Sequence, residues 1–492
     1  IDAVHQIGSL DRRTNYDTGV SIIEEMQAVA PRKKVLGDIK TKMDGLAMSP
    51  LRNVHKMTGY QEDSTLMALF DDLNNGIRRQ NKFVMEANQM FDSLREGKLQ
   101  NTFAAACNDV VDFELLDIDG KPVKMTRMDA MQIVLSFERE RANEDLIHME
   151  ANPVNIADPV LMRKGKVREA ISQGQMVWIG LEQIKMIESK LTEWDKQFMD
   201  KAREMFNGKA KDAINEMSRL LKHRNLATGK AYIPFHVDQN FVDREIEGVK
   251  VDSTIEGAGS LKSLSKKATQ PLIITGLNHV IDDHIGFVGK YYGLAVPIRN
   301  FNKAYNIKKV GSTLSVKSAI DNVWGRTGLD VIASAVRDLQ KSRERATDAL
   351  SKGLQALQSG FVKAALLSNV SVTIKQASSY YSAGLHLSPL ALARYQAAVP
   401  RLFAAPNGSY AKNLYAEIDK HTAQHWIRRQ GMSTQELGEN AQRKGKLADF
   451  ERKLPASLNP VKWIQNMDVA TTGALWLACK KEIQNSGNYE LN

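Results

Sequence analysis

Residues 329–385 decide the fold class, and they read LDVIASAVRDLQKSRERATDALSKGLQALQSGFVKAALLSNVSVTIKQASSYYSAGL. In the first part of this stretch, apolar residues recur at alternating steps of three and four positions, with one skip at Arg343. That spacing places them on one face of a helix. The stripe comprises Leu329, Ile332, Val336, Leu339, Ala346, Leu350, Leu354, Leu357 and Phe361. Because no proline interrupts the run, we predict one long spine helix against which other helices pack.

Length and composition are those of a large folded chain. It has 492 residues, of which 43% are hydrophobic, enough for a large core or several helical subdomains. It starts with Ile-Asp instead of Met, so we expect a portion of a longer or processed polypeptide. The sequence contains no secretory signal and no uninterrupted apolar run of about 18 residues. Cys107 and Cys479 lie in apolar helical contexts, and we predict two buried, reduced thiols.

The net charge of +10 is concentrated in the last third of the chain. From Lys341 onward there are 20 Lys and Arg against 11 Asp and Glu, whereas the first 340 residues hold 47 and 46. Such a region can neutralise nucleic-acid phosphates, meet an anionic membrane, or simply form a solvated helical surface. We take its clusters as candidate contacts with DNA or a partner protein. They are Arg428, Arg429, Arg443, Lys444, Lys446, Arg452 and Lys453.

The fold class that we predict is mainly α, an elongated multi-helix assembly with the spine helix and one small β-hairpin. The hairpin surrounds the turn dipeptide Asp119-Gly120. Helix caps are predicted at Ser64 or Asp63, at Thr126 with Asp129 three residues on, and at Thr192. The stretch VREAISQGQMVWIGLEQIKMIES, residues 167–189, is interpreted as continuing helix.

Changes in pattern divide the chain into five segments. The predicted segments are a leader of short helices and extended chain at 1–62, a helical domain with the hairpin near 113–126 at 63–238, a flexible loop rich in Gly, Ser and charges at 239–270, a central helical region with the spine helix at 271–388, and a basic C-terminal helical region at 389–492.

Three groups of polar residues have partial metal-ligand spacing, and each is incomplete. His279, Asp283 and His284 lack a third ligand on one surface, and Asp145 with His148 lacks the second copy that a di-iron bundle needs. The charged residues on the helix that leads to His148 are interpreted as a solvated face.

The third group, His421 and His425, has the four-residue spacing of zinc helices. Thr422 stands where a metalloprotease has its catalytic Glu, so we predict surface or interface histidines. We therefore expect no metal and no cofactor. The sequence also contains no phosphate-binding glycine loop and no G-x-S-x-G elbow, so it does not predict an enzyme.

Six segments in order resemble the helical region shared by phage large polyvalent proteins and by large internal virion proteins, the ejection or inner-core proteins. They cover about residues 110–385, with a looser likeness in WIQNMDVATTGALWLACKKEI. The six segments are GKPVKMTRMDAMQIVLSFERERANEDLIHM, SKLTEWDKQFMDKAREMFN, GKAYIPFHVD, LNHVIDDHIGFVGKYYGLAVPIRN, IDNVWGRTGLDVIASAVRDL and VKAALLSNVSVTIKQASSYYSA.

The resemblance implies a structural protein that is packaged inside the virion and delivered with the genome into the host envelope or cytoplasm. The partners that it implies are the portal or other ejection proteins, further copies of the chain, double-stranded DNA bound without sequence preference, and transiently the host membrane. It defines no catalytic residue. The alternative is an injected effector or anti-defence module whose activity is not evident in these residues.

Overall fold

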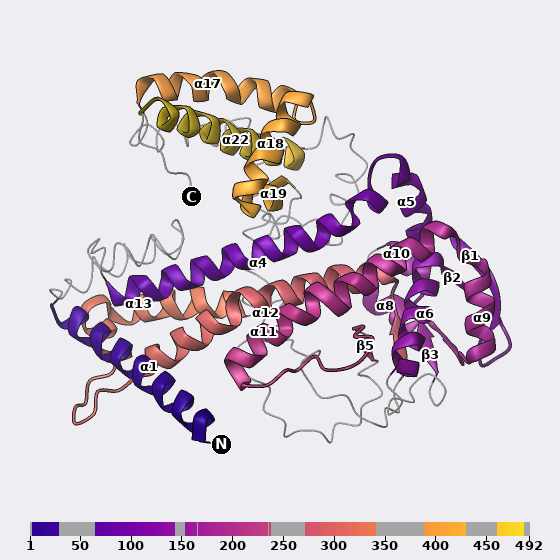
Figure 1. Ribbon diagram of the computed structural model, residues 1–492, viewed down its shortest axis with the longest axis horizontal. Helices are drawn as coiled ribbons and strands as arrows, with labels where there is room; N and C mark the ends of the chain where they lie inside the picture. Colours follow the sequence, from indigo (N-terminus) through magenta and orange to yellow (C-terminus); the bar gives the residue numbers. More distant parts are fainter. Residues whose placement is uncertain are drawn as a thin grey trace. The chain divides into compact units, whose positions relative to one another are not determined.

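The computed structural model describes residues 2–28, 64–142, 153–164, 166–234, 236–237, 271–340, 388–429 and 460–486 (Figure 1). It divides into two compact units, Ile1–Arg343 and Glu344–Asn492, which we call unit 1 and unit 2. Both are mainly helical, which confirms the predicted fold class. The flexible loop at 239–270, the spine beyond Gln340, and the pair Asp145 and His148 lie outside the described residues, and the division into five segments stays a prediction.

Two long helices run along each other through unit 1, although the sequence placed them in different segments. They are α4, Thr65–Arg95, and α12, Leu277–Tyr305 (Figure 1). Ser64 caps α4 as predicted, since its side chain accepts from the backbone N–H of Met67. The helices approach closest at glycines, because a Cβ on Gly293 would lie 2.3 Å from the carbonyl oxygen of Gly76.

The first core of unit 1 lies where the predicted hairpin meets short helices. The hairpin is present, as β1, Val110–Leu116, and β2, Pro122–Thr126, paired antiparallel. Thr126 with Asp129 forms the predicted capping box. Thr192 caps α10 as predicted, and it does so in a capping box with Asp195. The surrounding helices are η1, Gly97–Leu99; α5, Gln100–Asn108; α6, Arg127–Ala142; α9, Leu181–Lys190; and α10, Glu193–Glu204.

A four-stranded sheet adjoins this core, and its strand β4 interrupts the stretch 167–189 that the sequence predicted as continuing helix. Its order is β4, Gln175–Val177; β3, Val154–Ile156; β6, Leu272–Ile274; and β5, His236–Val237. Only the β3–β6 pair is parallel. Helices α7, Pro159–Arg163, and α8, Val167–Ser172, join β3 to β4.

The helix prediction was wrong here because strands of two or three residues are too short to show an alternating pattern. The chain needs a glycine at position 174, between α8 and β4, because a Cβ there would lie 2.6 Å from the carbonyl oxygen of Ile156.

The second core of unit 1 joins the first helix to the start of the spine. Residues Asp2–Ala28 form one helix, α1, and not the predicted leader of short helices and extended chain. Where its side chains are described, from Thr14 onward, the buried apolar residues Ile22, Ile23 and Met26 lie in its last turns. These pack in one cluster with residues of α4, α12 and α13, Val316–Gln340, so tertiary contacts stabilise α1.

The spine helix is confirmed in part. Ile332 and Val336 are buried and Leu329 is partly buried in the second core, as the apolar stripe predicted. Helix α13 as a whole begins at Val316, but Gly325, with φ 70° and ψ 177°, forms a kink between two helical stretches. The second stretch, which carries the apolar stripe, therefore begins shortly before Leu329.

Unit 2 packs helices around a small-residue face. It contains α17, Pro389–Ala404; α18, Ser409–His421; α19, Ala423–Arg429; and α22, Pro460–Ser486. Ala470, Ala474 and Ala478 recur every four residues on α22 and are fully buried, which lets neighbouring helices approach closely. In the described parts of both units, no helix is long and apolar enough to cross a membrane.

Candidate functional site

A stripe of polar side chains on α6 is buried in the first core, where the sequence predicted a solvated charged face. Its members are exposed by 8% or less. They are Asp129, Gln132, Ser136, Arg139 and Glu140, at positions that share one side of a helix. The prediction was wrong because α6 also carries apolar residues all round, from Met128 to Phe137, so every face packs against protein.

The first half of the stripe fixes the backbone around it. Both Asp129 and Gln132 form hydrogen bonds with main-chain atoms. Asp129 Oδ2 accepts from the N–H of Thr126 at 2.8 Å. Gln132 Oε1 accepts from the N–H groups of Thr275 and Gly276 at 3.0 and 2.9 Å, and its Nε2 donates to the oxygen of Ile273 at 3.2 Å. Gln132 thereby ties the turn between β6 and α12 to α6.

Burial also changes the acidity of Asp129. It raises the pKa of this carboxyl from 3.8 to about 6, and the hydrogen bonds from Thr126 offset only part of the effect.

The second half of the stripe leads into what we call the polar-aromatic cluster, made of Arg139, Phe206, Tyr232, His284 and Phe287. The His284 ring lies 5.6 Å from the Phe206 ring, 5.6 Å from the Tyr232 ring and 6.3 Å from the Phe287 ring, between centroids. Burial lowers the pKa of Arg139 to about 10, and Glu140 and Tyr232 oppose that shift, so the guanidinium stays charged at neutral pH.

Tyr232 has an unusual environment in this cluster. Burial raises the pKa of its hydroxyl, and Arg139 opposes the shift. The hydroxyl has no hydrogen-bond partner within the described residues, and the same holds for the hydroxyl of Ser136. The phenol is therefore neutral throughout the physiological range.

A π-helical turn positions two sides of the cluster. This turn, η2, Met205–Ala210, joins α10 to α11, Lys211–Lys222. It presents Phe206 to His284, and the Asn207 Oδ1 accepts from the backbone N–H of Tyr232 at 2.5 Å. At its far end, Lys209 Nζ lies 2.5 Å from Glu86 on α4. Single π-turns inside helices are frequent at functional sites, so the polar-aromatic cluster beside this turn is a candidate functional site.

The predicted candidates on α12 are divided between buried and exposed positions. His284 is buried and belongs to the polar-aromatic cluster, whereas His279 and Asp283 are exposed. Asp282, which was not a candidate, pairs with Arg95, whose NH2 lies 3.1 Å from its Oδ1 and 2.6 Å from Asn278 Oδ1. Burial raises the pKa of Asp282, and Arg95 opposes it. Among the described residues, no group of three His, Cys, Asp or Glu side chains is arranged to hold a metal ion.

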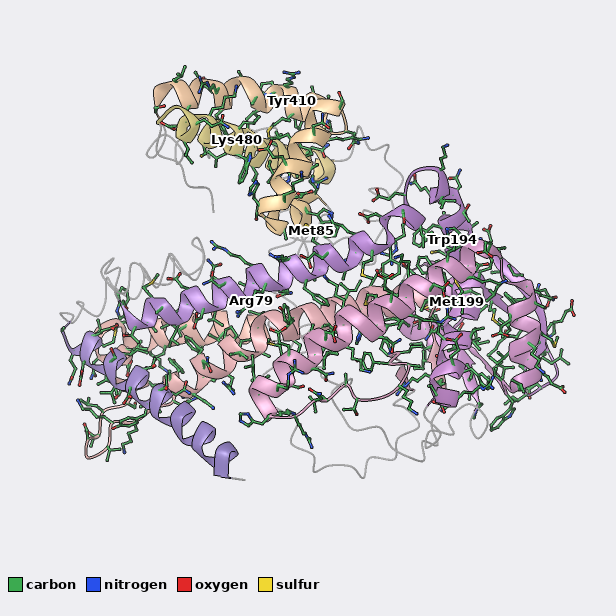
Figure 2. The ribbon with its side chains drawn as sticks, in the orientation of Figure 1. Arg79, Met85, Trp194, Met199, Tyr410 and Lys480 are labelled. Carbon is green, nitrogen blue, oxygen red and sulfur yellow. The ribbon has the colours of Figure 1, made fainter. Side chains whose placement is uncertain are left out.

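Arg95 occupies a slot made of aromatic rings at the end of α4. Its guanidinium carbon lies 4.9 Å from the Phe91 ring, 5.6 Å from Phe103 and 5.9 Å from Phe198. Trp194 of α10 stacks on Phe198 at 5.2 Å in the same region (Figure 2). The planar cation thus joins α4, α5, α10 and α12.

His421 and His425, the pair with zinc-helix spacing, do not share a helix. Helix α18 ends at His421, Thr422 is extended, and α19 starts one residue later. His421 is exposed, as predicted, but His425 is only 1% exposed, so its prediction as a surface or interface residue was wrong. The break at Thr422 turns His425 inward, where Nδ1 lies 3.4 Å from Asp419 Oδ1 and the ring lies 4.8 Å from the Tyr415 ring.

One of the seven predicted basic contacts can be placed by its side chain. Arg429 pairs with Asp419 and lies over the Tyr415 ring, so its charge is used inside unit 2. Arg428 belongs to α19, but its side chain lies outside the described residues. The other five, Arg443, Lys444, Lys446, Arg452 and Lys453, lie wholly outside the described residues.

The cysteines are free thiols that are half-buried, and not fully buried as predicted. Burial raises the pKa of Cys107 to about 11, so this thiol is neutral and a weak nucleophile at physiological pH.

Comparison of the chain with protein-family models, with curated proteins and with solved structures found no match. Sequence reasoning missed Arg139 and Tyr232, although one signal was present. A helix that is apolar all round is a buried helix, and any charge on it is then buried too.

Proposed function

We propose that the chain is an internal virion protein of a phage, packaged in the capsid and assisting delivery of the genome across the host envelope. Its role is structural: helical subdomains build a rigid body, and the basic last third contacts DNA or a partner virion protein. The support is the resemblance of six segments, in order, to the helical region of such proteins.

The observation that carries most weight is where these segments lie in the fold. Each residue of the polar-aromatic cluster belongs to one of four resembling segments. Arg139 belongs to 120–149, Phe206 to 189–207, Tyr232 to 229–238, and His284 and Phe287 to 277–300. Segments that are far apart in sequence and meet in one buried cluster are typical of a shared structural core.

The chemistry of the cluster favours a structural role over catalysis. Arg139 and His284 are nearly sealed from solvent, at 6% and 5% exposure. A charged side chain in such a place stabilises one particular packing of its neighbours, because any other packing would leave the charge without its partners. This fits a protein whose work is to hold a defined shape.

Mass spectrometry of purified particles tests the proposal. Peptides of this chain are expected in full virions and are expected to be depleted from particles that have released their DNA, at constant amounts of capsid protein. Absence from full virions, or retention after release, would contradict it. An isolated chain that acts on host DNA or host enzymes would instead favour the injected effector.

A further inference from the structure

One end of unit 1 carries a concentration of exposed apolar side chains. Leu116 and Ile118 are each 59% exposed, Trp178 is 52% exposed and Leu181 is 45% exposed. We call these four residues the hairpin patch. They come from the end of β1, the hairpin turn, the residue after β4, and the first residue of α9. Figure 1 shows β1, β2 and α9 together at the end of unit 1 opposite α1.

The four side chains belong to one surface because the backbone brings their elements together. The N–H of Ile118 donates to the carbonyl oxygen of Met176, 3.1 Å away, which places the turn beside β4 and Trp178. At the other end of α9, Lys190 Nζ contacts Glu114 Oε1 at 2.9 Å. Helix α9 therefore runs antiparallel to β1, and its Leu181 end lies near the turn.

Local alternation shows that these side chains point outward. Leu115, Val177 and Ile179 are exposed by 3% or less and point into the core. Their neighbours Leu116 and Trp178 therefore face solvent. Exposed apolar side chains that gather on one surface usually mark a contact with another molecule.

The charges around the patch indicate which kind of molecule makes this contact. Asp117 and Asp119 flank Ile118 and Lys121 follows in the turn, while Glu182 and Lys185 follow Leu181 on α9; Asp117 is half-buried and the other four are exposed. Within the described residues none of the five forms an ion pair, unlike Glu114, which pairs with Lys190. Three acids and two bases make a rim of mixed charge, which lacks the cationic surplus that nucleic acid or an anionic membrane requires.

We propose that the hairpin patch is the contact surface for a second copy of this chain, patch against patch about a twofold axis. In such an arrangement each surface must complement itself. The apolar centres cover each other, and the acids of one rim lie against the bases of the other. Because the patch is much smaller than a standard interface of about 20 residues a side, the dimer is expected to dissociate in the micromolar range.

Sedimentation velocity of the full chain over a concentration series measures this directly. The parent is expected to pass from monomer to dimer, and Ile118→Glu with Trp178→Glu is expected to weaken dimerisation by at least about 30-fold, since it places four carboxylates in the apolar centre. Leu220→Glu is the matched control, because Leu220 is also 52% exposed but lies on α11. It is expected to dimerise like the parent, and circular dichroism verifies that all variants are folded.

Charge exchange at the rim tests the patch-to-patch geometry without touching the apolar centre. Lys121→Glu with Lys185→Glu gives an all-acidic rim, and Asp119→Lys with Glu182→Lys gives a rim that is basic except for Asp117. Each variant alone is expected to remain monomeric, and an equal mixture is expected to form heterodimers.

Several results would overturn the inference: a parent that stays monomeric up to about 100 µM, dimers that survive the Ile118 and Trp178 changes, or a mixture that does not associate. Binding of monomers to phosphatidylcholine vesicles through the same residues would assign the patch to membrane instead. The inference stands on the surface alone and does not depend on a virion role, so its failure leaves the mass spectrometry of particles unaffected.

Discussion

Asp129 illustrates how burial sets the state of a single side chain in this protein. Its raised pKa, about 6 against 3.8, means that the folded protein binds a proton more tightly than the unfolded chain does. The associated stability is fully present below pH 3.8 and is lost as the pH rises through about 6.

Asp129→Asn removes this titration and keeps an oxygen that can accept from Thr126. Relative to the parent, the variant is therefore expected to gain about 2 kcal/mol of unfolding free energy between pH 4.5 and pH 7.5. Urea unfolding of both proteins at the two pH values measures it. An equal difference at both values would show that Asp129 does not titrate in this range.

Tyr232 allows the polar-aromatic cluster to be tested at a single atom. Because its buried hydroxyl has no hydrogen-bond partner in the part of the chain that the structure describes, Tyr232→Phe is expected to change the unfolding free energy by no more than about 1 kcal/mol, and in the stabilising direction. Tyr232→Ala removes the ring contacts with His284 and is expected to cost about 2–4 kcal/mol. If thermal or urea unfolding shows the Phe variant to be as unstable as the Ala variant, the hydroxyl has a role that the structure does not explain.

At the scale of the elements, the close approach of α4 and α12 depends on glycine. A Cβ on Gly293 would lie 2.3 Å from a carbonyl oxygen of α4, whereas a Cβ on Gly286 of the same helix would meet only open space. Gly293→Ala is therefore expected to destabilise unit 1 by about 3 kcal/mol. Gly286→Ala, the matched control, is expected to stabilise it by up to about 1 kcal/mol. Similar denaturation curves for the two variants would mean that the helices do not touch at Gly293.

Elements with a local signature could be predicted from the sequence. The hairpin has its Asp119-Gly120 turn, and the caps at Ser64, Thr126 and Thr192 have their hydrogen-bonding residues. Each of these signals depends on residues within a few positions of one another.

Elements that depend on distant contacts could not be predicted. The four-stranded sheet pairs β3 with β6, which lies more than a hundred residues later, and α1 is stabilised by residues of α12 and α13. For the candidate site, His284 was considered as a metal ligand and rejected, and its aromatic packing was not predicted. The burial of Arg139 and Tyr232 became evident only when α6, the π-turn and α12 were seen together.

At the scale of the whole molecule, the uneven charge predicts how the chain meets DNA. The full chain is expected to bind double-stranded DNA weakly, without sequence preference, and less tightly as salt rises. Reversing Arg443, Lys444 and Lys446 to Glu should weaken binding and reduce the slope of log affinity against log salt by up to about 3.

A matched control separates this basic region from net charge alone. Lys98, Lys196 and Arg224 are exposed cations of unit 1, and reversing them to Glu changes the net charge by the same amount. Fluorescence anisotropy at several salt concentrations compares the two variants. An equal loss in both would show that the last third is not the contact region, and no binding by the parent at low salt would assign the charges to solvation or to an acidic partner protein.

Delivery of the chain with the genome is the central claim, and a split-luciferase infection assay tests it most directly. Virions would carry the chain fused to a small luciferase fragment, and host cells would express the complementing fragment in the cytoplasm or in the periplasm. Protein synthesis in the host would be blocked, so that any light comes from protein brought in by the particle. If the chain is delivered with the genome, light is expected to rise together with genome delivery in at least one compartment. Infection that delivers the genome without light in either compartment would contradict it.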